Sequence, residues 1–372
     1  MTLWLHLSQD TPPSHVADPL SYLARQWPEL SVVVTSDAAL SERDIAGLPG
    51  ARLHDAPPDT ARAVRQFIET HGLRAALWVG DLRPCYLVQT HRHGIRSVWA
   101  DACIDPGRAW RLRWLPLSDG AALQALKAVL AAPGPEVERL AALPALRDRI
   151  ETPGALQPGV AAAPCDMSER DALAVILHAR PVWFAAFVDP GEVSAVLQAH
   201  AMASRLSHRL LLILHPARPE DGAALRDELA RDGWRAVLRS EGEDPREETQ
   251  VLVADTEDEL GLWYRLATIT FVGGTFAGGP TRSPLEPAAL GSVVLHGPQG
   301  GAQADAFERL HGFRAAHRVA GAEALGRAVE KYLSPDAAAE MAHHGWQAVS
   351  AGADVANRLV DLLDELLNEA GA

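Results

Sequence analysis

The sequence predicts an α/β protein with two doubly wound parallel sheets, each in its own domain, and a cleft between them. Three observations support this prediction: the length, the alternation of short apolar runs with amphipathic stretches, and one interruption rich in Pro and Gly. The chain has 372 residues, about twice a typical domain, so each half can bury its own core. Strands that alternate with helices need crossover connections, which produce parallel sheets covered on both faces.

The first half alternates in this way from its beginning. Its apolar runs predict strands, and the stretches between them have the spacing of amphipathic helices. The strands are expected at residues 3–7, 30–36, 75–81 and 97–103, and the helices at 15–27 and 84–94. This half therefore reads as a Rossmann-like domain.

The alternation of strands and helices stops near the middle of the chain and then starts again. Residues 151–166 are rich in Pro and Gly and have no amphipathic period, which is typical of a linker. Strands are then expected at 181–189, 209–216, 235–240, 250–255, 268–274 and 292–297, helices at 219–233 and 257–267, and a helical tail at 337–370. We assign domains to 1–155 and 167–350, a linker to 156–166, and a terminal helix to 351–372 that crosses back to the first domain.

Charge and cysteine content exclude several classes of protein. The formal net charge of −14 argues against nucleic acid as the main partner, because phosphate binding needs a basic surface. Three widely spaced cysteines form neither a disulfide framework nor a paired metal motif, so a reducing cytoplasm fits. The first residues lack the basic segment of a signal peptide, and no apolar run reaches the ~20 residues of a spanning helix.

Motifs for common cofactors are missing. The sequence has no GxGxxG fingerprint after its first strand and no GxxxxGK[ST] loop, so nicotinamide and ATP chemistry lose support. His91 and His93 are spaced like two metal ligands, but no further ligands converge on them, and a solvated helix end explains them better. We expect no cofactor and no metal.

The stretch "FVGGTFAGGPTRSPLEPAALG", residues 271–291, predicts a binding site. Gly273 and Gly274 let a ligand approach the backbone closely, and Thr275 adds a hydroxyl. Pro284 suits a first helical turn, whose free N–H groups attract anions. Glu286 either accepts hydrogen bonds from ribose or sugar hydroxyls or only complements the helix dipole, and the spacing leaves both open.

A family resemblance extends this interpretation. "ADTEDELGLWYRLATITFVGGTF", then "PLEPAALG" and "HGPQ", closely resemble the C-terminal half of the 3-deoxy-D-manno-octulosonic acid (Kdo) transferases. These are GT-B glycosyltransferases that move Kdo from CMP-Kdo onto a lipid A precursor. The resemblance continues through "RSEGE", "LILHPARPE", "RPVWFAAFVDPGEVSAVLQAHAMA", "HGIRSVWADA", "ALWVGDLRP" and "LWLHLSQD", and so covers nearly the whole chain.

The resemblance implies a role for each half. It implies a GT-B fold, with an N-terminal acceptor domain and a C-terminal donor domain facing across the cleft, and no metal. The glycine turn and the "PLEPAALG" helix would hold CMP. The residues implied at the donor are Arg218, Gly273, Gly274, Thr275, Arg282, Ser283, Glu286, Gly297 and Pro298. Arg218 would meet phosphate, since Arg binds it bidentately, unless it only begins a solvated helix.

The sequence departs from the family where chemistry is expected. Family members carry Ser-Val-Gly-Glu after the first strand, and that Glu is the presumed general base, whereas this chain has "HLSQDTPPS". Asp10 is the nearby carboxylate and is either the base or a turn residue. "PTRS", residues 280–283, replaces the family's Gly-Gly-His/Gln-Asn, and Phe187–Asp189 replaces Ser-Thr-His. The groups near the sugar and the acceptor are therefore changed.

One segment suggests a lipid contact. "GRAWRLRWLPL" carries three arginines and two tryptophans, namely Arg108, Trp110, Arg111, Arg113 and Trp114. Arg is attracted to anionic surfaces and Trp prefers the membrane interface, so the segment is expected to dock a phosphorylated lipid or the bilayer. A helix that buries both tryptophans and exposes its arginines explains the pattern equally well.

Together these observations predict a glycosyltransferase that moves Kdo from CMP-Kdo to a lipid A precursor in lipopolysaccharide core synthesis. Its partners would be CMP-Kdo or a related nucleotide sugar, a lipid A precursor and, peripherally, the membrane, with no nucleic acid. It would work in the cytoplasm, at the cytoplasmic face of the inner membrane. Two alternatives stay open: a catalytically impaired paralogue that binds nucleotide sugar or lipid, and an active transferase for a different sugar.

Overall fold

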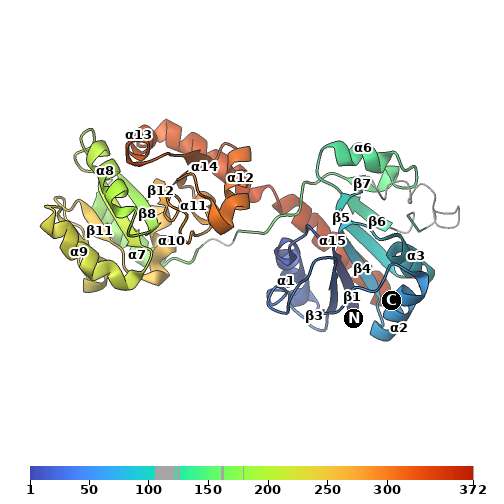
Figure 1. Ribbon diagram of the computed structural model, residues 1–372. Helices are drawn as coiled ribbons and strands as arrows, with labels where there is room; N and C mark the ends of the chain where they lie inside the picture. The colour runs from blue at the N-terminus through green and yellow to red at the C-terminus, as the bar shows by residue number, and fades with distance from the viewer. Residues whose placement is uncertain (105–121, 124–125, 161–162, 179, 372) are drawn as a thin grey trace. The chain divides into compact units, whose positions relative to one another are not determined.

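The computed structural model describes residues 1–104, 122–123, 126–160, 163–178 and 180–371. The chain divides into two compact units, which we call unit 1 (residues 1–159 and 351–372) and unit 2 (residues 160–350). Each unit contains one sheet of seven parallel strands with helices on both faces (Figure 1). The predicted α/β class with two doubly wound parallel sheets is confirmed.

The sheet of unit 1 has the strand order β3-β2-β1-β4-β5-β6-β7. Its strands are β1 (Thr2–Leu7), β2 (Ser31–Ser36), β3 (Ala51–Leu53), β4 (Ala75–Asp81), β5 (Arg96–Cys103), β6 (Leu126–Leu130) and β7 (Ile150–Glu151). Its helices are η1 (Pro13–Val16), α1 (Ala17–Gln26), α2 (Ala61–His71), α3 (Pro84–Arg92), α6 (Pro135–Ala141), η2 (Arg147–Arg149) and α15 (Ala353–Gly371). The four strands and two helices that the sequence predicted here are all present, whereas β3, α2, β6, α6 and β7 were not predicted.

Local signals explain where these elements begin and end. The central strands β1 and β4 are buried on both faces, so their sequences are continuous apolar runs rather than alternating ones. Helix α2 begins after Thr60, whose hydroxyl accepts a hydrogen bond from the Ala63 N–H. It ends at Gly72, which adopts the left-handed conformation with φ 57°.

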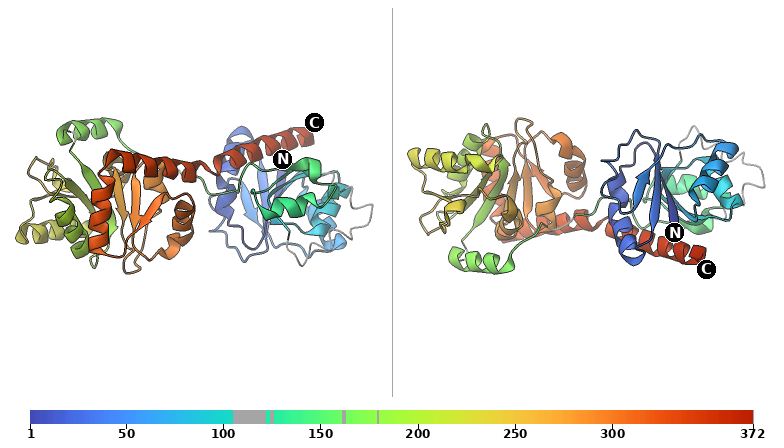
Figure 2. Two further views of the ribbon diagram at one scale, coloured as in Figure 1. Left: turned by 90° about the horizontal axis from the view of Figure 1, so that it is seen from above. Right: turned by 90° about the horizontal axis from the view of Figure 1, so that it is seen from below.

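Helix α15 belongs to unit 1, although its sequence follows unit 2. It lies along the sheet of unit 1 (Figure 2) and buries one apolar face against α1, β4, β5 and β6. The guanidinium of Arg358 donates two hydrogen bonds to Glu151, at 2.6 and 2.8 Å, which ties the helix to β7. The buried side chains are Val355, Leu359, Leu362, Leu363, Leu366 and Leu367.

Shortening one side chain of this face is expected to destabilise unit 1. Leu363 is 0% exposed, so Leu363→Ala leaves a cavity and lowers the free energy of unfolding of unit 1 by about 2–5 kcal/mol. Hydrogen exchange in a urea series reports the two units separately. Asp361→Ala, on the exposed face of the same helix, is the control and should change stability by less than about 0.5 kcal/mol. Equal effects of the two substitutions would contradict this packing.

The sheet of unit 2 has the strand order β10-β11-β9-β8-β12-β13-β14. Its strands are β8 (Val182–Val188), β9 (Leu211–Pro216), β10 (Ala236–Leu238), β11 (Val251–Val253), β12 (Ile269–Val272), β13 (Val293–His296) and β14 (Ala316–Arg318). Its helices are α7 (Met167–Leu177), α8 (Val193–Ala203), η3 (Pro219–Asp221), α9 (Gly222–Arg231), η4 (Arg239–Glu241), η5 (Glu257–Glu259), α10 (Leu260–Leu266), α11 (Leu285–Ala289), η6 (Gly301–Gln303), α12 (Ala304–Gly312), α13 (Ala322–Tyr332) and α14 (Pro335–Ser350). All six strands predicted for this half are present, and the short β14 was not predicted.

The arrangement of unit 2 gathers its loops at one edge. Helices α8, α9 and α13 contribute to the core on one face of the sheet, and α7 and α10 to the core on the other. Because all strands are parallel, the loops that follow β8, β9, β12 and β13 meet at the carboxyl edge, where ligands bind in such sheets. Across the described helices, none combines the length and apolar character needed to cross a membrane.

Candidate functional site

The glycine turn after β12 is shaped by the backbone around it. A Cβ on Gly273 would lie 2.3 Å from the Phe187 carbonyl oxygen at the end of β8. Gly274 has φ +72°, and its Cβ would lie 2.2 Å from the Pro280 carbonyl oxygen. These positions therefore require glycine because neighbouring backbone passes within contact distance. The sequence alone predicts the same requirement from an approaching ligand.

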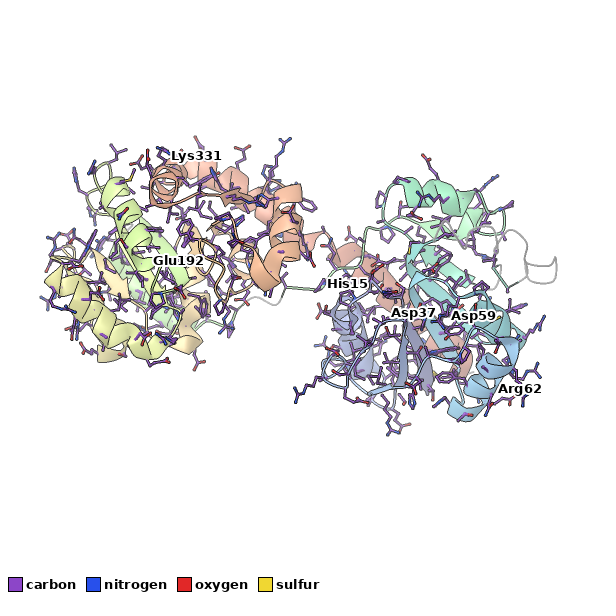
Figure 3. The ribbon with its side chains drawn as sticks, in the orientation of Figure 1. His15, Asp37, Asp59, Arg62, Glu192 and Lys331 are labelled. Atoms are coloured by element: carbon purple, nitrogen blue, oxygen red, sulfur yellow. The ribbon has the colours of Figure 1, made fainter. Side chains whose placement is uncertain are left out.

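Glu192, which lies directly before α8 and is labelled in Figure 3, binds backbone amides of this turn. Its side chain is 1% exposed. Oε2 accepts hydrogen bonds from the N–H groups of Gly274 at 2.7 Å and Asp189 at 3.3 Å, and Oε1 accepts one from the Phe276 N–H at 2.8 Å. The N–H of Gly274, in the turn that was predicted to hold CMP, is thus bound to a carboxylate of the chain itself. A role of Gly274 at the donor stays a prediction.

Thr275 and Gly297 join the loops that follow β12 and β13. Thr275 is fully buried, and its Oγ1 donates to the Val272 carbonyl at 2.6 Å and accepts from the Gly297 N–H at 2.7 Å. The Gln299 N–H donates to the Thr275 carbonyl at 2.9 Å. Both residues therefore stabilise the loop pair, while Pro298 beside them is exposed.

The helix start at Pro284 offers fewer amides than the sequence suggested. Helix α11 begins at Leu285 and has five residues. Pro284 and Pro287 carry no N–H, and the Leu285 N–H donates to the Ser283 hydroxyl at 3.3 Å. The prediction of a row of free N–H donors at this point is therefore wrong, and Ser283 has a capping contact instead.

Arg282 and Glu286 lie at the carboxyl edge of the sheet in unit 2. Three buried rings are close to them, those of Phe187, His215 and Tyr264. The guanidinium carbon of Arg282 is 4.5 Å from the centre of the Phe187 ring, a cation–π distance. The ring of His215, at the end of β9, is 4.5 Å from that of Phe187. Phe187 has φ 55°, unusual for a residue with a side chain. The end of β8 therefore presents an aromatic face to the Arg282 cation.

The charges of this group are coupled. Burial raises the pKa of Glu286, and the charge of Arg282 opposes that rise. Burial also raises the pKa of Tyr264, on α10, with Glu286 adding to the effect and Arg282 opposing it. Burial lowers the pKa of His215, and the charge of Arg282 lowers it further. At neutral pH the group therefore holds one cation beside a neutral imidazole and a neutral phenol.

This group can bind an anion and a hydroxyl side by side. Within the described part of the chain, Arg282 forms no ion pair within 4.0 Å, and its side chain is exposed. A planar guanidinium is suited to phosphate or carboxylate groups. Glu286 can accept hydrogen bonds from hydroxyl groups when it is ionised. We call Phe187, His215, Tyr264, Arg282 and Glu286 the Arg282 cluster.

Arg218 lies in a different place from the Arg282 cluster. It lines a groove of about 610 Å³ between α8 and α9, together with Leu197 and Leu225. Its Nε donates to Asp221 at 2.8 Å, and its side chain is 63% exposed. Arg218 directly precedes η3. This position agrees with the alternative in which Arg218 only begins a solvated helix. Its role at the donor phosphate stays a prediction.

In unit 1, Asp10 lies in a turn after β1. The turn is closed by a hydrogen bond from the Thr11 N–H to the Ser8 carbonyl at 3.1 Å, and the Asp10 side chain is exposed. This is the turn position that the sequence left as the alternative to a catalytic base. The predicted lipid contacts, Arg108, Trp110, Arg111, Arg113 and Trp114, lie outside the described residues and stay predictions.

A histidine and an aspartate that the sequence analysis did not select meet at the carboxyl edge of the sheet in unit 1. His15 Nδ1, in η1, is 4.0 Å from Asp101 Oδ2, at the end of β5 (Figure 3 labels His15). Asp101 Oδ1 accepts a hydrogen bond from the Leu156 N–H at 2.7 Å. Burial raises the pKa of Asp101 to about 6. Asp101 also has φ 45°, a conformation that β-strand patterns cannot reveal.

Further charged groups in unit 1 form a buried network. Asp37 accepts a hydrogen bond from Arg83 and lies 3.4 Å from His6 Nε2. His6 is 1% exposed, whereas Asp37 and Arg83 are exposed at 14% and 21%, so the imidazole is closed to a substrate and the two charged groups are partly accessible. No group of three or more His, Cys, Asp or Glu residues that could hold a metal ion occurs within the ranges the structure describes.

The sequence is similar to those of known sugar transferases. Residues 3–158 match the family model described as 3-deoxy-D-manno-octulosonic-acid transferase (kdotransferase). A 3-deoxy-D-manno-octulosonic acid transferase of Haemophilus influenzae is 33% identical over 190 residues, which are 50% of this chain and 44% of that protein. One of Bordetella pertussis is 29% identical over 322 residues, 84% of this chain and 73% of that protein. The match thus spans less than half the length of the Haemophilus protein.

Among solved structures, the C-terminal CMP-Kdo binding domain of WaaA from Acinetobacter baumannii is similar to part of the chain. The similarity covers 54% of this chain and 99% of that domain, with 23% identity and a TM-score of 0.40.

Proposed function

We propose that this chain is a member of the Kdo transferase family and that it moves Kdo from CMP-Kdo to a lipid A precursor. The observation that carries the proposal within the chain is the Arg282 cluster, which places an exposed cation and a carboxylate at the carboxyl edge of unit 2. CMP-Kdo carries a phosphate, a sugar carboxylate and several hydroxyls. One cation and one acceptor side by side match that set of groups.

In the proposed reaction, unit 2 holds the donor and unit 1 supplies a base. A hydroxyl of the acceptor loses its proton to the base, and its oxygen forms a bond to the anomeric carbon of Kdo. The bond from that carbon to the phosphate oxygen breaks, and CMP leaves with the electron pair. Arg282 and Arg218 are the cations we assign to the negative groups of the donor, and electrostatic stabilisation of the leaving group is commonly the largest catalytic effect. The reaction as proposed needs no metal or cofactor.

Membrane contact remains part of the proposal. The acceptor is a lipid, so we propose that the arginine and tryptophan segment at residues 107–117 meets it at the cytoplasmic face of the inner membrane.

The proposal is tested by release of CMP. Purified chain is incubated with CMP-Kdo and a tetra-acylated lipid A precursor, and CMP is measured against a reaction without protein. Release that requires both substrates supports the proposal. No release, with CMP-Kdo binding intact by calorimetry, would instead favour the nucleotide-sugar binder that we keep as the alternative.

Arg282→Ala is expected to weaken donor use. Loss of one hydrogen bond between charged groups costs roughly 1.5–3 kcal/mol, so KM for CMP-Kdo should rise about 10- to 100-fold. Arg282→Lys should recover part of the lost affinity, because lysine restores the positive charge but not the planar guanidinium that forms two parallel hydrogen bonds. Arg205→Ala, exposed just beyond the far end of α8, is the control. A KM for Arg282→Ala equal to that of the control would remove Arg282 from the site.

A further inference from the structure

We propose that unit 2 contains a second anion site, formed by Arg314, Lys331 and His344, that binds the phosphate group of a phosphomonoester. The three side chains line a pocket of about 190 Å³ together with Tyr332. The site goes beyond the proposed transfer, because it lies at the edge of the sheet opposite to the Arg282 cluster.

The position of the pocket follows from the topology of unit 2. Strands β13 and β14 are parallel, so α12, which connects them, returns the chain to the amino edge of the sheet. Arg314 lies at this edge, between α12 and β14. Lys331, labelled in Figure 3, lies near the end of α13, and His344 reaches the same pocket from α14. The donor is expected at the carboxyl edge, so the two sites are separate.

The backbone of Arg314 has a conformation that favours glycine. Its φ is 59°, and it follows the end of α12, where the Ala315 N–H donates to the Leu310 carbonyl at 2.8 Å. Glycine is the usual residue at such a helix end, because a side chain strains the left-handed conformation. Arginine therefore costs stability here, and strained backbone of this kind is concentrated at binding sites.

The two cations of the pocket have no carboxylate partner. Within the described part of the chain, neither Arg314 nor Lys331 forms an ion pair within 4.0 Å, and Glu340, which lines the same pocket, pairs with neither. By contrast, Arg327, one turn before Lys331, pairs with Glu323. In a chain with a net charge of −14, two unpaired cations that line one pocket create a local attraction for anions.

Buried groups hold the Lys331 ammonium in place. It lies 4.8 Å from the centre of the Tyr332 ring and donates to the Tyr332 hydroxyl at 3.4 Å. Tyr332 is 4% exposed, and its hydroxyl lies 3.0 Å from His317 Nδ1. Burial lowers the pKa of His317, and the charge of Lys331 lowers it further. The ammonium is therefore oriented beside a neutral imidazole and keeps N–H groups for a ligand.

The size and the donors of the pocket indicate the ligand class. Pockets for drug-sized molecules measure about 300–1,000 Å³, so 190 Å³ suits a phosphate group and is too small for a nucleotide sugar. A guanidinium, an ammonium and an imidazole together offer enough N–H groups for the terminal oxygens of a phosphomonoester. Dissolved phosphate compounds and lipid headgroups both carry this group.

Binding of inorganic phosphate tests the site. The full chain carrying Arg282→Ala, which removes the cation of the donor region, is titrated with phosphate or with chloride at matched ionic strength. The NMR amide signals of residues 314–316 and 331–333 should shift with phosphate and not with chloride. Arg314→Gly and Lys331→Ala should each raise Kd about 10- to 100-fold. Arg314→Gly should not lower Tm, because glycine relieves the strain. Arg327→Ala is the control and should keep Kd within about twofold.

Vesicles distinguish the two sources of the phosphate group. Phosphatidylcholine vesicles contain either phosphatidic acid, a phosphomonoester, or phosphatidylglycerol, a phosphodiester. Cosedimentation with phosphatidic acid that falls in Arg314→Gly and Lys331→Ala supports a lipid headgroup as the ligand, and phosphate binding without it supports a dissolved compound. Signals that ignore phosphate or respond equally to chloride overturn the site, as do equal Kd values in Arg314→Gly, Lys331→Ala and Arg327→Ala. None of these outcomes depends on CMP release, so the transfer proposal is judged separately.

Discussion

Glu192→Ala is expected to destabilise unit 2 by about 3–5 kcal/mol and to abolish binding of CMP-Kdo. Its carboxylate accepts two short hydrogen bonds, from the N–H groups of Gly274 and Phe276, and each such bond to a buried charge is worth roughly 1.5–3 kcal/mol. Without it, both amides are left without an acceptor inside the protein. The turn that places Arg282 beside Phe187 then loses its anchor to α8.

The substitution is checked by hydrogen exchange in a urea series and by calorimetry with CMP-Kdo. Glu192→Gln keeps one carbonyl oxygen as an acceptor, so it should lose about half as much stability. Glu220→Ala, exposed in η3 of the same unit, should leave both stability and binding unchanged. If the stability of unit 2 in Glu192→Ala matches that of Glu220→Ala, the carboxylate does not hold the turn.

Unit 2 is also expected to lose stability steeply as pH falls from about 6.5 to 4. His200 is fully buried, and its Nδ1 accepts a hydrogen bond from Trp183 Nε1 at 3.1 Å. Burial lowers the pKa of His200 to about 4, and burial with the charge of His311 lowers the pKa of His296 to about 4. The ordinary histidine pKa is about 6.5. In this window the unfolded chain binds protons that the folded unit does not, so stability falls as pH falls.

The expected loss is roughly 3 kcal/mol for each of the two histidines. It is measured as the free energy of unfolding of unit 2 at pH 7, 6, 5 and 4. His200→Gln should give a shallower dependence, since one of the buried imidazoles with a pKa of about 4 is gone, while His208→Gln on the surface should keep the wild-type slope. A free energy that is constant across this window would contradict neutral, buried imidazoles.

The fold could be predicted from the sequence because its strongest signals are local. The strands β1, β4, β8 and β9 are buried on both faces, so each appears as a continuous apolar run. The strands that were not predicted are short: β3 and β14 have three residues each, and their pairing depends on neighbours far along the chain. Helix α15 has a clear apolar face, and the contacts of that face place it in unit 1.

The site could be predicted only as a region. The sequence predicts a binding site at the glycine turn, yet the group that binds the amides of this turn, Glu192, comes from a segment 82 residues earlier. Glu192 lies directly before a helix, where a carboxylate is equally expected as a partner for the helix dipole. The sequence therefore does not reveal that this carboxylate binds the distant glycine turn. The same holds for Asp101 and His15, which are 86 positions apart and meet only because a loop crosses Gly80.

The most direct measurement of the central claim is the mass of the lipid product. Full-length chain is incubated with a tetra-acylated lipid A precursor and either CMP-Kdo or CMP-N-acetylneuraminic acid, and the lipid is analysed by mass spectrometry. The proposed function predicts a lipid that gains one or more Kdo residues with CMP-Kdo and nothing with the other donor. An unchanged lipid in the presence of CMP-Kdo, or transfer from CMP-N-acetylneuraminic acid instead, would contradict it.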